Sequence, residues 1–469
     1  MSKILPNLPI ENLTVDSDYL GIIDKGEIIK TFLETNIEEF SQVKMFSLYG
    51  EWGSGKSTLM KYLQKELNGS FNTFFFEAWE FESDSNLSLS LLEFLTTESQ
   101  DSTNKALGEI VEIAGKLFKG FSKSMRITFP GLSIDGSKII ETLEEAPVET
   151  FLQLKKKFKT EFVRWEDLIT KGKNPKYNIV FIDDLDRCEP ENVLNLLSAL
   201  KLFFTYGEKT IFFCGVDKKA INEAVRTKYG KVVKANEYLE KIFDISFTMP
   251  EHENLLKLVS VYFEDKDVSN RVSIFLKDLD FTNPRRVKKM FNKFYILRNI
   301  RKSSKKGNYI GLMPDFYFEG SGNYLETILT LYFIILHEFF PSKYRDLFDF
   351  KKKEANFYKA FQGSNIETQR VQISQRINKN IIQQPFYTIL DDTPDRNFEH
   401  YSLALLPCDA DSLTSSSFKK DQFHTFKVKK KEIEYRFVLH LYNNNVFDIK
   451  NGFSECTLIG LKKMVRNII

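Results

Sequence analysis

Short apolar runs alternate with amphipathic stretches over the first 250 residues of the chain. The apolar runs, which predict strands, lie at 45–50, 71–79, 178–183, 210–216 and 241–249. Between them, apolar residues recur at the spacing of one helix face, in stretches at 56–67, 87–95, 191–204 and 217–229. Continuous apolar strands that alternate with helices are typical of a parallel sheet buried on both faces. The pattern therefore predicts an α/β fold in which helices flank a parallel sheet.

The rest of the pattern divides the chain into further regions. Residues 1–40 predict an N-terminal lead-in with one amphipathic helix, and 41–270 predict the α/β core. Within the core, the apolar periodicity becomes patchy from about 100 to 170, where Gly, Ser and Lys are frequent, which indicates an insertion. Residues 271–380 have a mainly helical pattern and predict a lid, whereas 381–469 mix short strands with polar turns and predict an α+β region.

Composition and charge narrow the classes of protein that fit. A chain of 469 residues, 42% hydrophobic and 28% charged, is globular and has room for roughly two to four domains. Its 66 Lys and Arg against 64 Asp and Glu leave a charge of +2, so no global field attracts nucleic acid or an anionic membrane. The four cysteines, at 188, 214, 408 and 456, form no C-x-x-C pair and suit a reducing compartment. Since no signal-like N-terminus and no apolar run of about 20 residues occurs, we expect a cytoplasmic protein.

One motif carries specific chemistry. The segment GEWGSGKS fits the phosphate-binding pattern G-x-x-x-x-G-K-[ST] at every fixed position, and it lies between an apolar strand and an amphipathic helix. Glycines let backbone N–H groups approach phosphate oxygens, while Lys56 is placed to reach the β- and γ-phosphates and Ser57 to bind Mg²⁺. A chance match is the alternative, which the strand–loop–helix context disfavours. The expected nucleotide-binding residues are Gly50, Glu51, Trp52, Gly53, Ser54, Gly55, Lys56, Ser57 and Thr58.

An acidic turn follows the third apolar run. In NIVFIDDLDRC, Asp183 ends the strand and is placed to hold Mg²⁺ through water. Either Asp184 or Asp186 is a candidate to orient or deprotonate an attacking water, and the sequence does not choose between them. A solvated acidic turn paired with Arg187 is the alternative. Together with the phosphate-binding motif, this turn predicts ATP and Mg²⁺ as ligands and ATP hydrolysis as the reaction.

These motifs, in their order along the chain, resemble those of the KAP family of P-loop NTPases. The resemblance rests on GEWGSGKST, FFFEAW, FIDDLDRC, CGVDKKAI and YLEKIFDISFTMP, and it covers roughly residues 15–300. It implies an additional-strand P-loop core related to the AAA+ and STAND ATPases, with an acidic residue that activates water. Many family members carry transmembrane segments between the two Walker motifs, whereas the 100–170 stretch here contains LGEIVEIAGKLFKGFSKSM, which is too short and too charged to span. Since the family includes phage-exclusion proteins, antiviral defence is expected by analogy.

A basic run begins after Asn283. Arg285 and Arg286 resemble the family's sensor arginine, which implies a catalytic cation aimed at the γ-phosphate. The run holds ten cations between 285 and 306 with no acid among them. Nucleic acid or an anionic membrane is therefore a candidate partner of this run, and a solvated face is the alternative. We further expect a homo-oligomer, with an effector protein as another candidate partner.

Two single residues have structural alternatives. Asp217 follows the fourth apolar run, where it is either a polar sensor or a helix cap. Trp79, in FFFEAW, is expected to pack in the core.

The leading hypothesis for function is an Mg-ATP-hydrolysing P-loop ATPase that couples turnover to conformational change or assembly. The alternative is a slow-turnover nucleotide switch of the STAND kind, which would gate a partner effector. Both use the same P-loop, so the steady-state rate of ATP hydrolysis separates them.

Overall fold

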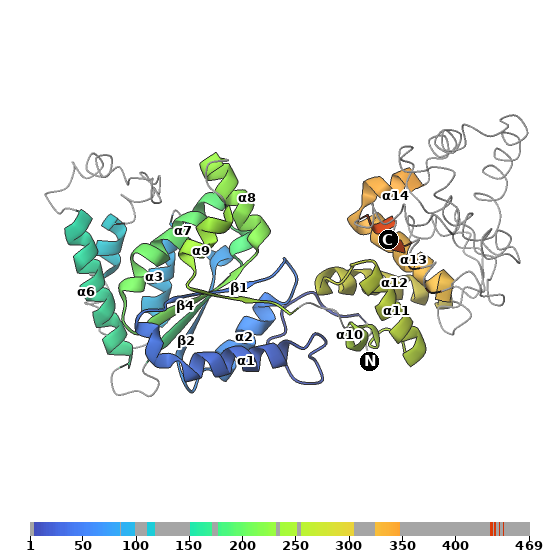
Figure 1. Ribbon diagram of the computed structural model, residues 1–469, viewed down its shortest axis with the longest axis horizontal. Helices are drawn as coiled ribbons and strands as arrows, with labels where there is room; N and C mark the ends of the chain where they lie inside the picture. Colours follow the sequence, from blue (N-terminus) through green and yellow to red (C-terminus); the bar gives the residue numbers. More distant parts are fainter. Residues whose placement is uncertain are drawn as a thin grey trace, which may run out of the picture. The chain divides into compact units, whose positions relative to one another are not determined.

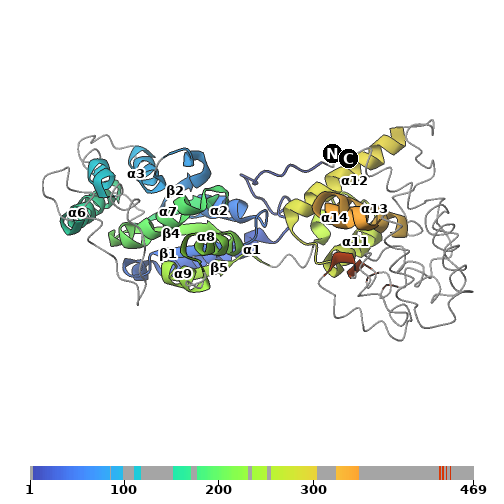
Figure 2. The same cartoon turned by 90° about the horizontal axis from the view of Figure 1, so that it is seen from above.

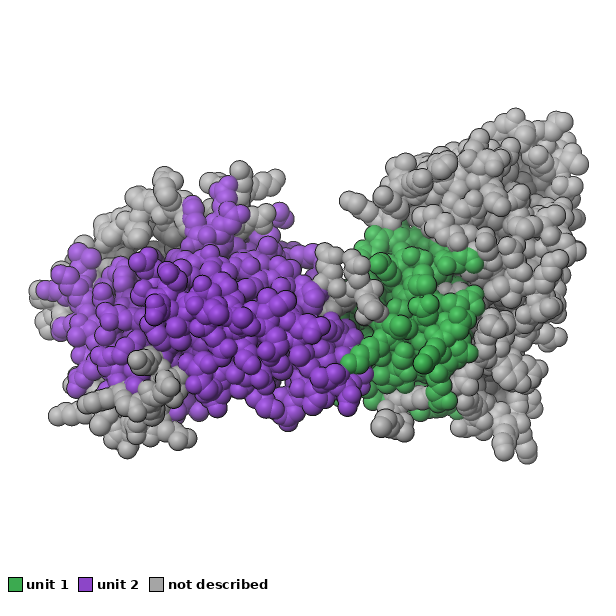
Figure 3. Space-filling model, turned by 60° about the horizontal axis from the view of Figure 1, so that its bottom comes forward, with its two compact units in different colours: residues 1–7, 252–469 green, residues 8–251 purple. Residues whose placement is uncertain are grey.

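The computed structural model describes residues 4–84, 86–98, 110–117, 151–170, 177–230, 235–250, 255–303 and 324–347, together with a few positions between 432 and 444. Contacts between residues divide the chain into two compact units (Figure 3). The first unit, purple and labelled unit 2 in Figure 3, contains residues 8–251 and holds a sheet. The second, green and labelled unit 1 there, contains residues 1–7 and 252–469 and is helical in its described part.

Five parallel strands form the sheet of the first unit, as the apolar runs predict. They are β1 (Met45–Tyr49), β2 (Asn72–Glu77), β3 (Asn178–Asp183), β4 (Thr210–Val216) and β5 (Ile245–Thr248). The order across the sheet is β2-β3-β4-β1-β5, so β4 lies between the strand that precedes the phosphate-binding motif and the strand that ends in Asp183 (Figure 1). This confirms the α/β, additional-strand architecture.

The fifth strand is shorter than the predicted run at 241–249. The first two residues of that run, 241 and 242, belong to helix α9 (Ala235–Ile242), and β5 begins only at Ile245. Asp244 lies between them, and its carboxylate accepts hydrogen bonds of 3.0 Å from the backbone N–H groups of Lys44 and Met45. A polar side chain therefore anchors the beginning of β5 to β1, where the apolar pattern indicated continuous strand.

Helices cover both faces of the sheet (Figure 1 and Figure 2). Side chains alternate along β1, so that Phe46 and Leu48 pack in one core cluster while Met45 and Tyr49 pack in the other. The first cluster lies against α1 (Ile22–Thr35) and α2 (Lys56–Glu66). The second lies against α3 (Leu87–Glu98), α6 (Phe151–Thr170), α7 (Pro190–Leu202), α8 (Lys218–Tyr229) and α9. Short 3₁₀ turns connect elements at η1 (Ile37–Ser41), η2 (Ala78–Phe81), η3 (Leu185–Arg187) and η4 (Phe204–Tyr206).

Helix α6 packs on the core, although it lies within the predicted insertion from 100 to 170. Its aromatic residues Phe158, Phe162 and Trp165 are buried in the second cluster, and Glu166, fully buried, accepts hydrogen bonds from the backbone N–H groups of Glu208 (2.6 Å) and Lys209 (3.1 Å). The end of the supposed insertion is therefore part of the core, because its apolar face completes the packing on the sheet. Residues 110–117 are also helical and bury apolar side chains there, and 99–109 and 118–150 lie outside the described residues.

The second unit is mainly helical over 255–303 and 324–347, which agrees with the helical pattern of the sequence there. Its helices are α10 (Leu256–Val259), α11 (Lys266–Asp278), α12 (Pro284–Ser303), α13 (Tyr324–Phe339) and α14 (Pro341–Leu347). The units divide at 251/252, whereas the predicted core extends to 270, because α10 packs on α11 and α11 on α13. Most of the predicted α+β region at 381–469 lies outside the described residues. No helix in the described ranges is long and apolar enough to cross a membrane.

Candidate functional site

The loop after β1 has the backbone that phosphate binding requires. Gly53 and Gly55 have φ angles of 81° and 101°, a left-handed region that side-chain-bearing residues rarely adopt. A Cβ at Gly50 would lie 2.5 Å from the Ser54 hydroxyl oxygen, so this glycine also keeps the loop tight. The loop leads directly into the first residue of α2. Backbone N–H groups and the positive end of the helix dipole therefore converge at one point.

Lys56 is folded back onto this loop. Its Nζ donates hydrogen bonds to the backbone carbonyl oxygens of Gly50 (3.0 Å) and Glu51 (3.3 Å), and the residue is only 6% exposed. These carbonyl oxygens accept the hydrogen bonds that the ammonium group would donate to a phosphate when nucleotide is bound. The lysine is thus held within the loop, ready to exchange these carbonyls for phosphate oxygens.

Asp217 ties the loop to the neighbouring strand. It follows β4, and its Oδ2 accepts a 3.0 Å hydrogen bond from the backbone N–H of Trp52. Its Oδ1 accepts a 2.9 Å bond from the backbone N–H of Lys219 at the start of α8, so Asp217 is a helix cap. Lys219 also pairs with Glu51. Sequence reasoning left the helix cap and a polar sensor as alternatives, and it could not show that the same carboxylate supports the phosphate-binding loop.

Asp183 and Ser57 meet at the ends of β3 and the loop. The Asp183 carboxylate is 3% exposed, and the Ser57 hydroxyl is its neighbour. Burial raises the pKa of Asp183, while the neighbouring Ser57 hydroxyl, the backbone N–H of Asp184 and the charge of Lys56 act against this shift. Gly215 leaves room for the carboxylate, because a Cβ there would lie 2.9 Å from Asp183 Oδ1. Two motifs that are 126 positions apart therefore form one site.

The acids after Asp183 lie in a strained turn. Asp184 has a φ angle of 57°, uncommon for a residue with a side chain, and its Oδ1 lies 3.2 Å from Arg187 Nε. Burial and then the charge of Asp183 raise the pKa of Asp184 to about 6, although Arg187 acts in the opposite direction. Asp186 is half-buried in η3. Asp184 therefore pairs with Arg187, a contact that belonged to the alternative interpretation of this turn.

Residues after β2 border the same acids. Register pairs Glu77 with Asp183 across β2 and β3, so the two carboxyl-bearing positions are neighbours at one edge of the sheet. Trp79, expected in the core, is instead 54% exposed, and the Arg187 guanidinium lies 5.3 Å from the centroid of its ring. Sequence reasoning missed Glu77. The carboxyl ends of adjacent parallel strands were the signal that could have found it.

The model of the KAP family P-loop domain matches residues 27–301, more than half of the chain. The chain belongs to the KAP family of P-loop NTPases. Two uncharacterized proteins of Methanocaldococcus jannaschii are similar to parts of it. MJ0181 is 39% identical over 121 residues, which are 24% of this chain and 48% of that protein. MJ0182 is 34% identical over 168 residues, 28% of this chain and 84% of that protein. The chain thus spans about half of the first relative's length and most of the second's.

A KAP-type P-loop domain binds nucleotide, commonly with Mg²⁺, and the residues present fit that ion. Among the described residues, no group of three or more His, Cys, Asp or Glu side chains could hold a metal by itself. Mg²⁺ keeps several waters and takes one or two protein oxygens plus substrate phosphates. The neighbouring side-chain oxygens of Ser57 and Asp183 are such a pair. These two residues would hold the ion, as the sequence predicts.

Arg285 and Arg286 belong to α12 in the second compact unit, whereas the P-loop belongs to the first. Arg285 Nη2 donates a 3.4 Å hydrogen bond to the backbone carbonyl oxygen of Asn7, and the Arg286 guanidinium lies 5.8 Å from the centroid of the Phe339 ring. Both cations therefore have partners within their own unit. Their role as sensor arginines stays a prediction.

The basic run on α12 has an acid partner that its own sequence lacks. Glu338, on α13, pairs with Lys289 Nζ at 2.8 Å and also with Lys293. The charge of the run is thus partly neutralised by tertiary packing. Binding of nucleic acid or an anionic membrane stays a prediction. Outside the described residues lie Lys305, Lys306 and the side chains of Arg298, Arg301 and Lys302.

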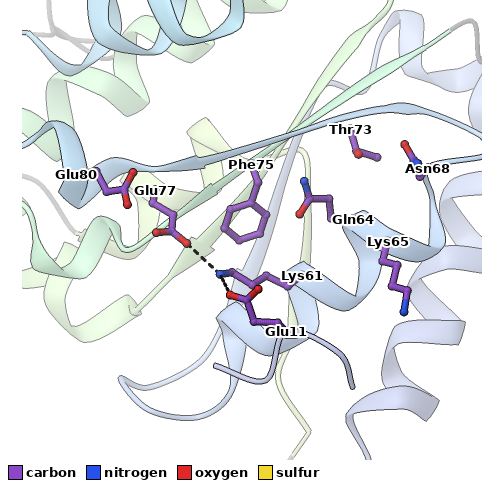
Figure 4. Close-up of a pocket in the computed structure, with 9 residues that line it drawn as sticks. All are labelled: Glu11, Lys61, Gln64, Lys65, Asn68, Thr73, Phe75, Glu77 and Glu80. Carbon is purple, nitrogen blue, oxygen red and sulfur yellow. Dashed lines mark hydrogen bonds and ion pairs between the residues drawn. The ribbon is translucent and has the colours of Figure 1, made fainter. Parts of the chain in front are cut away.

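A hollow of about 620 Å³ lies between α2 and the edge strand β2, beside the P-loop rather than in it (Figure 4). Lys61 lies at its centre and pairs with Glu11 (3.1 Å) and Glu77 (3.3 Å). The same Nζ is 5.6 Å from the centroid of the Phe75 ring. The charge of Lys61 is therefore already balanced by Glu11 and Glu77.

Proposed function

We propose that this protein binds Mg-ATP at the P-loop and hydrolyses it, and that turnover drives a conformational or assembly change. One observation carries the proposal: the loop that holds Lys56 and the strand that ends in Asp183 bring a phosphate-binding cation, the Ser57 hydroxyl and a buried carboxylate into one site. Family membership supports nucleotide binding. Hydrolysis is inferred from the acids that follow Asp183.

The chain's own groups would bind and orient the triphosphate. Loop N–H groups and the start of α2 take the phosphate oxygens, and Lys56 exchanges the carbonyls of Gly50 and Glu51 for the β- and γ-phosphates. When bound, Mg²⁺ supplies charge neutralisation on the phosphates. Asp217 keeps the loop in shape because it accepts the Trp52 N–H.

Asp184 is the better candidate for the residue that orients or deprotonates water. It directly follows Asp183 and is half-buried, and Arg187 holds its carboxylate by one oxygen, which leaves the other able to accept a proton or a hydrogen bond. Asp186 stays the second candidate, three positions beyond Asp183. Arg285 and Arg286 are proposed, from the family resemblance, to stabilise charge on the γ-phosphate.

One observation favours the second candidate function, a slow nucleotide switch that gates an effector. The carboxylate of Asp184 is held in an ion pair with Arg187, and an acid so engaged is a weak base until the pair loosens. Such a site would hydrolyse ATP slowly by itself and faster with a partner bound. A homo-oligomer and an effector protein are the partners we propose, and antiviral defence rests on family analogy alone.

Steady-state hydrolysis of ATP with Mg²⁺ tests the proposal. Lys56→Ala should abolish turnover in a folded protein, since loss of a phosphate-stabilising cation costs on the order of a thousandfold or more in rate. Lys65→Ala is the matched control, because Lys65 is an exposed lysine on the same helix. Turnover retained in folded Lys56→Ala would refute the assignment. Turnover that is slow alone and rises with an added partner would favour the switch.

A further inference from the structure

One arginine side chain connects the turn after β3 to the turn after β2. The guanidinium carbon of Arg187 lies 5.3 Å from the centroid of the Trp79 ring, and Nε of the same side chain lies 3.2 Å from Asp184 Oδ1. A guanidinium group donates hydrogen bonds in its plane and stacks through its face. Arg187 can therefore hold the carboxylate and lie against the indole at the same time.

The turn that carries Trp79 is itself anchored. Glu82 Oε1 accepts a 2.7 Å hydrogen bond from the backbone N–H of Glu189 and a 3.2 Å bond from Asn192 Nδ2, which ties the end of η2 to the start of α7. Phe81 of η2 stacks on Phe76 of β2, with ring centroids 4.8 Å apart. The backbone that presents the indole is therefore fixed on both sides.

Burial does not explain the position of Trp79. The residue is 54% exposed, and a large aromatic side chain at such a site gives little hydrophobic stabilisation. In contrast, the Arg187 side chain is 32% exposed and could adopt many rotamers. If Arg187 changed rotamer, the carboxylate of Asp184, which is paired with it, would move as well. A ring that packs against the guanidinium reduces the number of these rotamers. An acid must be held within a fraction of an ångström to act on a water molecule.

We propose that Trp79 is a positioning residue of this site: its ring fixes the Arg187 guanidinium, which in turn fixes the carboxylate of Asp184. The proposal rests on the proposed function only for the role of Asp184 in hydrolysis. The chain of contacts from Trp79 to Arg187 to Asp184 can be tested without turnover.

The first experiment measures acrylamide quenching of tryptophan fluorescence in the full chain. Each variant is measured with and without Trp79→Phe, so that the difference gives the signal of Trp79. Arg187→Gln should raise the quenching constant of Trp79, because the ring loses the group that covers it. Asp184→Asn should raise it as well, because Arg187 loses its carboxylate partner, whereas the matched control Asp186→Asn should leave it unchanged. Equal quenching constants of Trp79 in the parent, Arg187→Gln, Asp184→Asn and Asp186→Asn would overturn the proposal.

The second experiment measures ATP hydrolysis and ATP binding separately. Trp79→Leu should lower kcat by roughly threefold to tenfold without changing the affinity for ATP, and Trp79→Phe, which keeps an aromatic face, should restore most of the rate. Adding Trp79→Leu to Arg187→Gln should cause no further fall, because both act through one contact. The proposal would be overturned if the falls in kcat of the two single variants multiplied in the double variant, or if Trp79→Leu left kcat unchanged. A parent protein with no turnover would instead refute the proposed function, and the quenching result would still decide the contact.

Discussion

The carboxylate of Asp217 accepts a 3.0 Å hydrogen bond from the backbone N–H of Trp52, which lies 165 positions earlier in the chain. The two residues meet because β4, which Asp217 follows, pairs with β1, which precedes the phosphate-binding loop. The second carboxylate oxygen caps α8. One side chain thus joins the loop that would bind phosphate to the next helix along the sheet.

Asp217→Ala should weaken nucleotide binding as well as stability. We expect a loss of about 1 kcal/mol from the helix cap and a lower affinity for an ATP analogue, because the loop N–H of Trp52 loses its acceptor. The matched control is Asp265→Ala, which removes the cap of α11 in the second unit and should lower stability alone. Fluorescence titration and denaturant unfolding measure the two effects. Equal affinities in the two variants would contradict this role of Asp217.

The acids at the end of β3 should separate into two classes. Asp183→Asn should weaken Mg²⁺-dependent nucleotide binding, since this carboxylate and Ser57 are the groups that fit the ion. Asp184→Asn should spare binding and lower kcat. Isothermal titration with a non-hydrolysable analogue, beside steady-state rates, tells these apart. If Asp186→Asn loses turnover while Asp184→Asn keeps it, Asp186 is the residue that acts on water.

The buried carboxylate of Glu166 should be important for stability through its acceptors and not through its charge. Burial raises the pKa of Glu166, yet its oxygens accept the backbone N–H groups of Glu208 and Lys209. Glu166→Ala would leave these donors without acceptors and should cost about 2–4 kcal/mol. Glu166→Gln keeps one of the two acceptor oxygens and turns an NH2 group toward the other backbone N–H, so it should cost less than Glu166→Ala without being neutral. Urea unfolding of both variants checks this, and equal losses would contradict it.

Glu338 should make the second unit sensitive to acid. Burial alone would raise the pKa of Glu338, but hydrogen bonds from Lys289 and Lys293 outweigh it and hold the pKa below its ordinary value. The unfolded chain therefore binds the proton more readily than the folded chain. Stability from this group is full above the ordinary carboxyl pKa of about 4.5 and is lost as the pH falls through the lower folded value.

The measurement is unfolding free energy between about pH 5.5 and 3.5. Glu338→Gln should be less stable than the parent at the upper end and should lose less on acidification. His337 Nδ1 lies 3.6 Å from Glu338 Oε1, so His337→Gln is the control that separates the two groups. Parallel pH curves for the parent and Glu338→Gln would contradict this origin of the acid sensitivity.

Local pattern determined the α/β class and the chemistry of the two motifs. Apolar runs such as 178–183 and 210–216 correspond to observed strands to the residue, because strands buried on both faces are apolar over almost their whole length. The P-loop was recognisable because its glycines and Lys56 lie at a spacing that phosphate geometry dictates. Such features depend on neighbours within a few residues, and sequence shows these directly.

Tertiary structure alone decided which distant residues meet. Strand order placed β4 between β1 and β3, and so brought Asp217 to Trp52 and Glu77 beside Asp183. Packing on the sheet made α6 part of the core, and packing of α13 on α12 supplied Glu338 to a run without acids. These pairings result from the register of the sheet and from the packing of helices, and both depend on many weak contacts between distant parts of the chain. The spacing of residues within a short segment does not show such contacts, because the partners are more than 40 positions apart.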